Sequence, residues 1–283
     1  MNLVIQAPLE ARSDPGRLDV LAKLADAPAM QALSSHVWRC STACIDPEIQ
    51  RNVVVRAHTE GLDAAFVPAG RRLTDFKLLV IDMDSTLITI ECIDEIADMQ
   101  GLKSQVAAIT EAAMRGELPF RESLVRRVAL LEGLDAGALR RVIDERLQLS
   151  SGAEAMLAAV QAAGLKTLLV SGGFTFFTDH MQERLGLDFT QANQLEIING
   201  KLTGQVLGDI VDAEAKQNTV QNMCSTLGIT TAQAIVIGDG ANDLKMMAIA
   251  GLSVAFRAKP IVQDHADVAL NFVGLDGILA LFE

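Results

Sequence analysis

The segment VIDMDSTLI, from Val80 to Ile88, decides the fold class of this chain. It runs through aliphatic residues, places two aspartates around one methionine, and then becomes apolar again. A short aliphatic run bounded by polar residues is typical of a buried strand in a parallel sheet. Two carboxylates at the end of such a strand repel each other, and a bound cation or a retained proton offsets that repulsion. We therefore expect a functional site where this strand ends.

The composition predicts a folded globular protein. The chain has 283 residues, of which 50% are hydrophobic, so it can build one large domain or two modest ones. Its formal net charge of −12 repels nucleic acids and anionic membrane surfaces, and neither is expected as a partner. An anionic substrate needs local cations to hold it.

Cysteine usage and the N-terminus favour a cytoplasmic protein. The four cysteines, Cys40, Cys44, Cys92 and Cys224, are too few and too scattered for a disulfide framework. Cys40 and Cys44 have no His or Cys cluster nearby in the sequence that would complete a zinc site. Pro8 and nearby acids interrupt the N-terminal apolar run, so no signal peptide is expected. A membrane-spanning helix needs about 20 apolar residues, and the longest candidate contains two aspartates.

After Lys77, apolar strands alternate with helical segments, which predicts an α/β fold with a Rossmann-like parallel sheet. The expected strands are Leu78 to Ile81, Thr167 to Val170, Ala234 to Ile237 and Ser253 to Ala255. The first three run directly into the polar clusters DMDST, SGGF and GDGAND. Because the carboxyl ends of parallel strands line one crevice, we expect these clusters to converge.

A long insertion, at about residues 89 to 149, is expected to form a helical cap over the crevice. Two segments within it place apolar residues on one helical face: Phe120, Leu124, Val128 and Leu131, and then Leu139, Val142, Ile143 and Leu147. A second insertion contains LEIINGKLTG, where Asn199 and Gly200 between extended segments predict a hairpin.

Residues 1 to 74 are expected to form a small separate α+β domain. Short apolar runs alternate there with helix-like segments: Leu3 to Ile5, His36 to Trp38 and Ala64 to Val67, with Arg17 to Ala25 and Glu48 to Thr59. Nothing in this segment has a catalytic pattern. It could be regulatory and sense a small molecule, mediate a homodimer, or cover the core. Residues 75 to 283 then form the catalytic domain with its cap.

The residue types in the three clusters are suited to phosphoryl transfer. Asp82, which is closest to the strand, is expected to attack phosphorus and form an aspartyl phosphate. Asp84 would protonate the departing alkoxide and then take a proton from the attacking water. Oxygen ligands from Asp82, a main-chain carbonyl and Asp239 suit Mg²⁺.

The remaining polar residues can stabilise the phosphoryl charge. Ser171 and the Gly172 backbone supply hydrogen-bond donors, and Lys216 supplies a positive charge. Asn242 and Asp243, at the start of the next helix, are expected to orient the waters and ligands of the metal.

Each motif alone has an ordinary structural interpretation. An isolated DxD is common in loops, SGG is more often a turn, and a single lysine such as Lys216 is usually solvated. GDGAND lacks the third glycine of the dinucleotide motif GxGxxG. The catalytic interpretation is favoured because the motifs occur in order, each at a strand end or in the following helix.

This set of motifs resembles the haloacid dehalogenase-like phosphatase superfamily, whose pattern is DxDx[TV], a strand-end Ser or Thr, a Lys and a final GDxxxD. The match covers roughly residues 76 to 283. The segments ECIDEIAD, ITEAAMRGELPFRESLVRRVALL and VIGDGANDLKMM are similar to the branch that hydrolyses O-phospho-L-serine in the last step of L-serine biosynthesis. The resemblance implies the same core residues, with the carbonyl of Asp84 as the main-chain ligand of Mg²⁺.

The resemblance also implies substrate contacts that spacing alone does not identify. Glu91 is expected to bind the substrate ammonium and Arg127 its carboxylate, for which a guanidinium offers a bidentate fork. Met114 and Phe120 are expected as apolar walls, and Asn242 as a further substrate contact. From spacing alone, Arg127 is one of two adjacent solvated arginines and Phe120 belongs to the cap core.

Two other functions stay open on the sequence. A phosphotransferase would form the same aspartyl phosphate and differ only in the acceptor alcohol. A silent sensor of phosphoserine or serine would lack a catalytic group, whereas the chain has them all: Asp82, Asp84, Ser171, Lys216 and Asp239. Cys92 is expected to pack rather than react.

Overall fold

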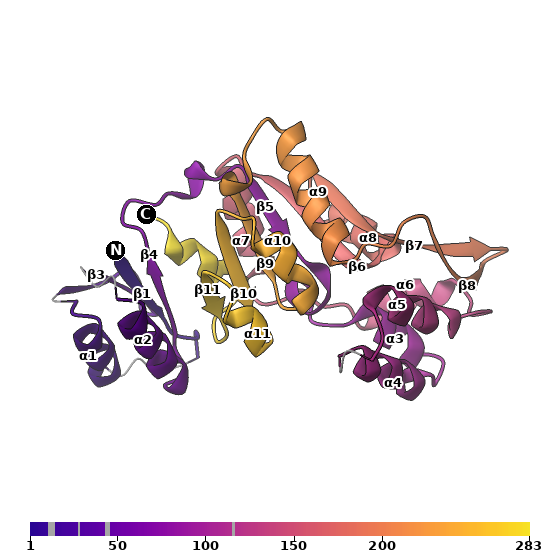
Figure 1. Ribbon diagram of the computed structural model, residues 1–283, viewed down its shortest axis with the longest axis horizontal. Helices are drawn as coiled ribbons and strands as arrows, with labels where there is room; N and C mark the ends of the chain where they lie inside the picture. Colours follow the sequence, from indigo (N-terminus) through magenta and orange to yellow (C-terminus); the bar gives the residue numbers. More distant parts are fainter. Residues whose placement is uncertain (11–14, 28, 43–45, 115–116) are drawn as a thin grey trace. The chain divides into compact units, whose positions relative to one another are not determined.

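The computed structural model describes residues 1–10, 15–27, 29–42, 46–114 and 117–283 (Figure 1). Cys44 lies outside the described residues. The chain forms two compact units. One comprises Met1–Leu79, Ser151–Lys166 and Ile229–Glu283, and the other comprises Val80–Ser150 and Thr167–Gly228.

The strands are β1 (Asn2–Gln6), β2 (Ala29–Ala32), β3 (Val37–Ser41), β4 (Asp63–Val67), β5 (Leu78–Ile81), β6 (Lys166–Phe174), β7 (Phe189–Ile198), β8 (Lys201–Leu207), β9 (Ala234–Gly238), β10 (Leu252–Phe256) and β11 (Val268–Leu270). The α-helices are α1 (Pro15–Leu24), α2 (Pro47–Thr59), α3 (Cys92–Asp98), α4 (Lys103–Met114), α5 (Phe120–Ala129), α6 (Gly137–Glu145), α7 (Ala153–Ala162), α8 (Thr175–Leu185), α9 (Ala213–Thr226), α10 (Leu244–Met247) and α11 (Pro260–Gln263). Shorter helical turns are η1 (Leu73–Asp75), η2 (Met83–Leu87), η3 (Thr231–Gln233), η4 (Ala241–Asp243) and η5 (Leu275–Leu281).

The N-terminal strands form an antiparallel sheet in the order β2-β3-β1-β4. On one face, Leu3 and Ile5 of β1 join a buried cluster with Leu21 of α1 and Val53 of α2. The α+β character expected for this segment is confirmed. Strand β2 was not predicted, because AMQA is short and mostly exposed at the sheet edge. The domain boundary at residue 74 stays a prediction.

The other face of this sheet contacts the last residues of the chain. Side chains alternate between the faces of a strand, so Asp63 and Arg39 point away from the helices. Asp63 accepts hydrogen bonds from the backbone N–H groups of Asn271, Phe272 and Val273 at 2.8, 2.9 and 3.0 Å. Arg39 donates to the carbonyls of residues 280 and 282 at 2.9 and 2.6 Å. These hydrogen bonds connect the N-terminal sheet to residues 271–282.

The second sheet has seven strands in the order β11-β10-β9-β5-β6-β7-β8. Its pairs are parallel where β10 meets β9 and β11 and where β6 meets β7, and antiparallel between β7 and β8. The four strands expected from the sequence are β5, β6, β9 and β10, so the α/β fold is confirmed. All four residues of β5 are buried, as a central parallel strand requires.

The insertion is helical, as expected, and comprises α3 to α6 (Figure 1). Its two linkers pair with each other: Thr89 N–H donates to the carbonyl of Gln148 at 2.9 Å, and Ser150 N–H donates to that of Leu87 at 2.9 Å. The predicted apolar faces are buried except at Phe120, which is half-buried.

The predicted hairpin joins β7 to β8 through two residues. Asn199 and Gly200 have φ angles of 52° and 76°, the left-handed conformations of a tight hairpin turn. A cap loop pairs with β8: Gly133 N–H donates to the carbonyl of Leu202 at 2.8 Å, and Leu202 N–H donates to that of Leu134 at 2.9 Å. The cap and the hairpin therefore share backbone hydrogen bonds.

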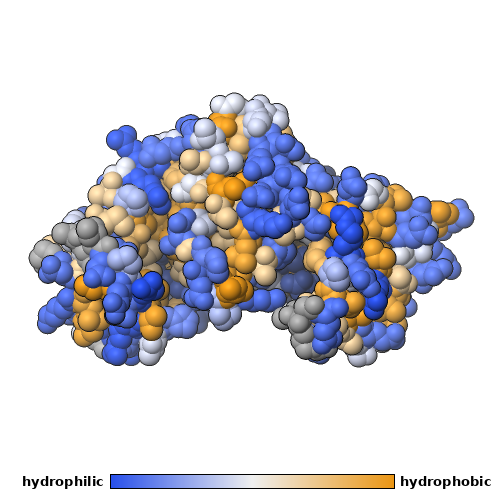
Figure 2. Space-filling model, in the orientation of Figure 1, coloured by the Kyte–Doolittle hydropathy of each residue, from blue (hydrophilic) through white to orange (hydrophobic). Residues whose placement is uncertain are grey.

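Apolar residues on the visible surface are interspersed with hydrophilic ones (Figure 2). Exposed large apolar side chains include Val20 and Val55. Single apolar residues scattered in this way are common on protein surfaces. Among the helices of the described ranges, none has the length and apolar character needed to cross a membrane.

Asp63→Ala is expected to destabilise the protein, because three backbone N–H groups lose their acceptor. An unsatisfied buried donor costs about 1–3 kcal/mol, so we expect urea denaturation to show a loss of about 3 kcal/mol in the free energy of unfolding. Asp144→Ala, which removes an exposed ion pair with Arg140, should change it by less than about 0.5 kcal/mol. Equal effects of the two variants would contradict the anchoring role of Asp63.

Candidate active site

Strand β5 carries two aspartates into an irregular turn. Asp82 follows the strand directly and is 4% exposed. The carbonyl of Asp82 accepts from Leu87 N–H at 3.2 Å, and that of Met83 accepts from Ile88 N–H at 3.0 Å. Ser85 takes the left-handed conformation, with a φ of 57°. The chain thus turns tightly after the strand and holds both carboxylates near its end.

Lys216 forms a buried ion pair with the first aspartate. Its Nζ donates to Asp82 Oδ1 at 2.7 Å, and the two side chains are 0% and 6% exposed. Lys216 lies on α9, whose N-cap is Asp212; the Asp212 side chain accepts from the N–H groups of Glu214 and Ala215. Lys216 is therefore a buried partner of Asp82 and not a solvated helix residue.

Asp84 has a different electrostatic environment from Asp82. Its Oδ1 is shielded from solvent and has no hydrogen-bond partner within the described part of the chain. The pKa of Asp84 is raised to about 7, chiefly by burial and secondly by the charge of Glu91, while hydrogen bonds from Cys92 and the charge of Lys216 act in the opposite direction. A carboxyl group with this pKa holds its proton for part of the time at neutral pH, as an acid catalyst must.

Two residues beside Asp84 come from the start of the cap. Burial raises the pKa of the Cys92 thiol well above its ordinary value, so the thiol stays protonated and can donate to Asp84. This agrees with a packing role for Cys92. Glu91 is exposed, and its Oε1 accepts from Ser85 Oγ at 2.6 Å.

The end of β6 forms a glycine loop next to Asp84. Gly173 N–H donates to Ser171 Oγ at 2.9 Å. A Cβ on Gly173 would lie 2.9 Å from Asp84 Oδ2, and one on Gly172 would lie 3.1 Å from Phe120 Cζ. A side chain at position 173 would therefore force a shift of Asp84, and the cap residue Phe120 lies close against Gly172.

The two adjacent arginines of α5 differ in their surroundings. Arg126 is exposed and pairs with Glu122. Arg127 is half-buried, and burial lowers its pKa, while the nearby charges of Asp94, Glu91 and Asp84 oppose that change. Asp94 was not identified from the sequence, because an acid within ECIDEIAD has no distinguishing spacing. Helix α4 ends at Met114, whose side chain lies outside the described residues, so its role stays a prediction.

The third cluster follows β9. Asp243 is fully buried, and its Oδ2 accepts from Gly240 N–H at 3.1 Å. The carbonyl of Asp239 accepts from Lys259 N–H at 3.1 Å. Asn242 is half-buried, and its contact with substrate stays a prediction.

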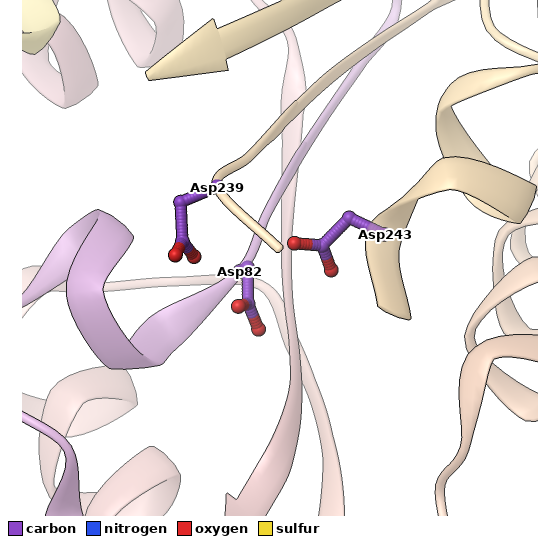
Figure 3. Close-up of side chains that lie close together, drawn as sticks. All are labelled: Asp82, Asp239 and Asp243. Atoms are coloured by element: carbon purple, nitrogen blue, oxygen red, sulfur yellow. The ribbon is translucent and has the colours of Figure 1, made fainter. Parts of the chain in front are cut away.

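Three carboxylates form a candidate metal centre. Asp82, Asp239 and Asp243 each offer a ligand atom, and these atoms lie within 4.8 Å of one another. Figure 3 shows the three side chains facing a common space. A set of carboxylate oxygens fits a hard divalent cation. Asp243, expected only to orient other ligands, stands here beside the two predicted ligands.

The family model for haloacid dehalogenase-like hydrolases matches residues 76–251. The chain belongs to this family. It is also similar to the phosphoserine phosphatase of Albidiferax ferrireducens, with 55% identity over 75% of this chain and 92% of the relative. The resemblance inferred from the motifs is thereby confirmed.

Solved structures of similar proteins agree with this placement. A probable phosphoserine phosphatase from Vibrio cholerae is 36% identical, with a TM-score of 0.82 over 99% of this chain and 85% of that one. A phospho-aspartyl intermediate analogue of phosphoserine phosphatase is 38% identical, with a TM-score of 0.69 over 74% of this chain and 99% of that one. The first of these likenesses includes the N-terminal sheet.

If Lys216 stabilises phosphoryl charge, as predicted from the sequence, Lys216→Met is expected to reduce the kcat/KM for p-nitrophenyl phosphate by at least about 100-fold, because that charge is lost. Steady-state kinetics on protein shown to be folded by circular dichroism provide the measurement. Lys201→Met, in the exposed hairpin, is the matched control and should leave kcat/KM within about twofold of wild type. Retention of near-normal turnover in Lys216→Met would exclude Lys216 from the site.

Proposed function

We propose that the chain hydrolyses O-phospho-L-serine to L-serine and phosphate with Mg²⁺, as the last step of L-serine biosynthesis. The observation that carries this proposal is the buried contact of Lys216 with Asp82 at 2.7 Å, next to a second aspartate whose pKa is raised to about 7. The named relatives support the choice of substrate.

In the first half-reaction, a carboxylate oxygen of Asp82 attacks phosphorus and the bond from phosphorus to the serine oxygen breaks. The carboxyl proton of Asp84 goes to the departing oxygen. Lys216, Ser171 and the Gly172 backbone stabilise the charge on the phosphoryl oxygens. The products of this half-reaction are serine and an aspartyl phosphate on Asp82.

In the second half-reaction, a water attacks the same phosphorus and gives a proton to Asp84. The bond between phosphorus and Asp82 then breaks and phosphate leaves. Because Asp84 ends with the proton it had at the start, one residue serves both halves. Its shielded position and raised pKa allow it to exchange this proton near neutral pH.

The acidic cluster fits the expected metal. Asp82 and Asp239 would hold Mg²⁺ together with the carbonyl of Asp84, and Asp243 would hold or orient its ligands. When bound, Mg²⁺ offsets the repulsion between these carboxylates and the phosphoryl oxygens.

The cap would select the amino-acid part of the substrate. Arg127 offers a bidentate fork for the substrate carboxylate, and Glu91 offers a carboxylate for the ammonium. Phe120, which lies against Gly172, would shield the reacting group from water. Met114 and Asn242 complete the proposed substrate contacts.

Asp82→Asn should abolish release of phosphate from O-phospho-L-serine, because an amide is a poor nucleophile. The assay uses Mg²⁺, then EDTA, with phosphothreonine and p-nitrophenyl phosphate as comparison substrates. We expect selective, metal-dependent release by the wild type and loss of at least about 1,000-fold in the variant. Release that survives both EDTA and the substitution would disprove the mechanism.

Arg127→Ala should reduce kcat/KM for phosphoserine by at least about 100-fold and that for p-nitrophenyl phosphate by less than about threefold, because only the first substrate has a carboxylate to bind. Arg126→Ala, the exposed neighbour, is the matched control and should change neither value appreciably. Equal losses on both substrates would assign Arg127 to chemistry or stability.

A further inference from the structure

Asn193, in the middle of β7, is a buried polar residue outside all the motifs. It is 1% exposed. Its Nδ2 donates to the carbonyl of Gly172 at 2.8 Å, and its Oδ1 accepts from Val211 N–H at 2.8 Å. A carbonyl only accepts and an N–H only donates, so the two partners fix the orientation of the amide.

The Gly172 carbonyl belongs to a segment of β6 in which the pairing with β7 is irregular. Between β6 and β7, Val170 is opposite Gln191 and Phe174 is opposite Asn193. Three residues of β6 thus lie between these two pairs, whereas β7 has only one. The residues between these pairs bulge out of the regular ladder. Asn193 supplies a side-chain donor to the carbonyl of Gly172 in this bulge. The geometry of the glycine loop therefore depends on a side chain of the neighbouring strand.

The second hydrogen-bond partner of Asn193, Val211, lies just before the helix that carries Lys216. Val211 precedes Asp212, the N-cap of α9. Lys216 N–H donates to the carbonyl of Asp212 at 2.9 Å, which places Lys216 in the first turn of that helix. A single amide thus bridges the glycine loop and the segment that begins the lysine helix.

We propose that Asn193 is a positioning residue that fixes the glycine loop and the start of α9 in one geometry, so that both act on the same phosphoryl group. This inference rests on the proposed function, because it takes these two segments to bind phosphate. Asn193 does not touch the substrate. Its role is to hold the groups that do, within the small tolerance that transition-state stabilisation requires.

Asn193→Asp is the main test. The aspartate has the same shape and keeps an acceptor for Val211, but it places an oxygen against the carbonyl of Gly172. We expect kcat/KM to fall at least about tenfold, in the same proportion for phosphoserine and p-nitrophenyl phosphate, because the phosphate group is common to both. The affinity for inorganic phosphate, measured by calorimetry with Mg²⁺, should fall in parallel.

Thr167→Val is the matched control. Thr167, near the start of β6, is 1% exposed; its Oγ1 donates to Asp188 Oδ2 at 3.0 Å and accepts from Asp188 N–H at 2.9 Å. It therefore also ties β6 to the residues that enter β7, but through residues outside the candidate site. This variant should lose thermal stability and keep kcat/KM within about twofold of wild type.

The outcomes separate the two proposals. If Asn193→Asp loses only thermal stability, as Thr167→Val does, with unchanged turnover and phosphate affinity, Asn193 is merely structural and the inference is overturned. If Asn193→Asp does not fold, Asn193→Ser at low temperature gives the same comparison. A wild type that cleaves only the aryl ester would refute phosphoserine as the substrate and leave the Asn193 test intact. If it cleaves neither ester, phosphate affinity still decides.

Discussion

A carboxylate and an ammonium held together out of water are the constraint on which the site depends. Each charge alone would be costly to bury, and each makes the other tolerable. The pair of Asp82 and Lys216 therefore requires a fixed position of α9 relative to the end of β5, although 134 residues separate the two side chains in the sequence. The short strand, the tight turn after it and the N-cap of α9 all serve this requirement.

The two aspartates of one tripeptide obtain different chemistry from their surroundings. Asp82, the proposed nucleophile, accepts a hydrogen bond from Lys216 Nζ on its Oδ1. Asp84 is shielded and faces another acid, Glu91, which favours the protonated form. In the proposed mechanism, two residues of the same type thus take the roles of nucleophile and acid within a single turn.

The parts that were predictable from the sequence are those governed by local rules. Asp82, directly after β5, and Ser171, in the last part of β6, follow from apolar runs and the geometry of parallel sheets. The turn at Asn199 follows from the conformational preference of two adjacent residues. The role of Asn193 does not follow, because it depends on a bulge between β6 and β7 that only their pairing reveals. The different surroundings of Arg126 and Arg127 likewise depend on tertiary packing.

The hydrogen bonds between the cap loop and β8 have a consequence for aggregation. β8 is the last strand of its sheet, and an uncovered edge strand offers backbone groups to other chains. Here residues 133 and 134 occupy part of that edge through Leu202. The cap therefore blocks part of this edge from pairing with another molecule. A shortened chain without residues 89 to 149 would expose this edge, and its poor solubility would say nothing about its catalytic groups.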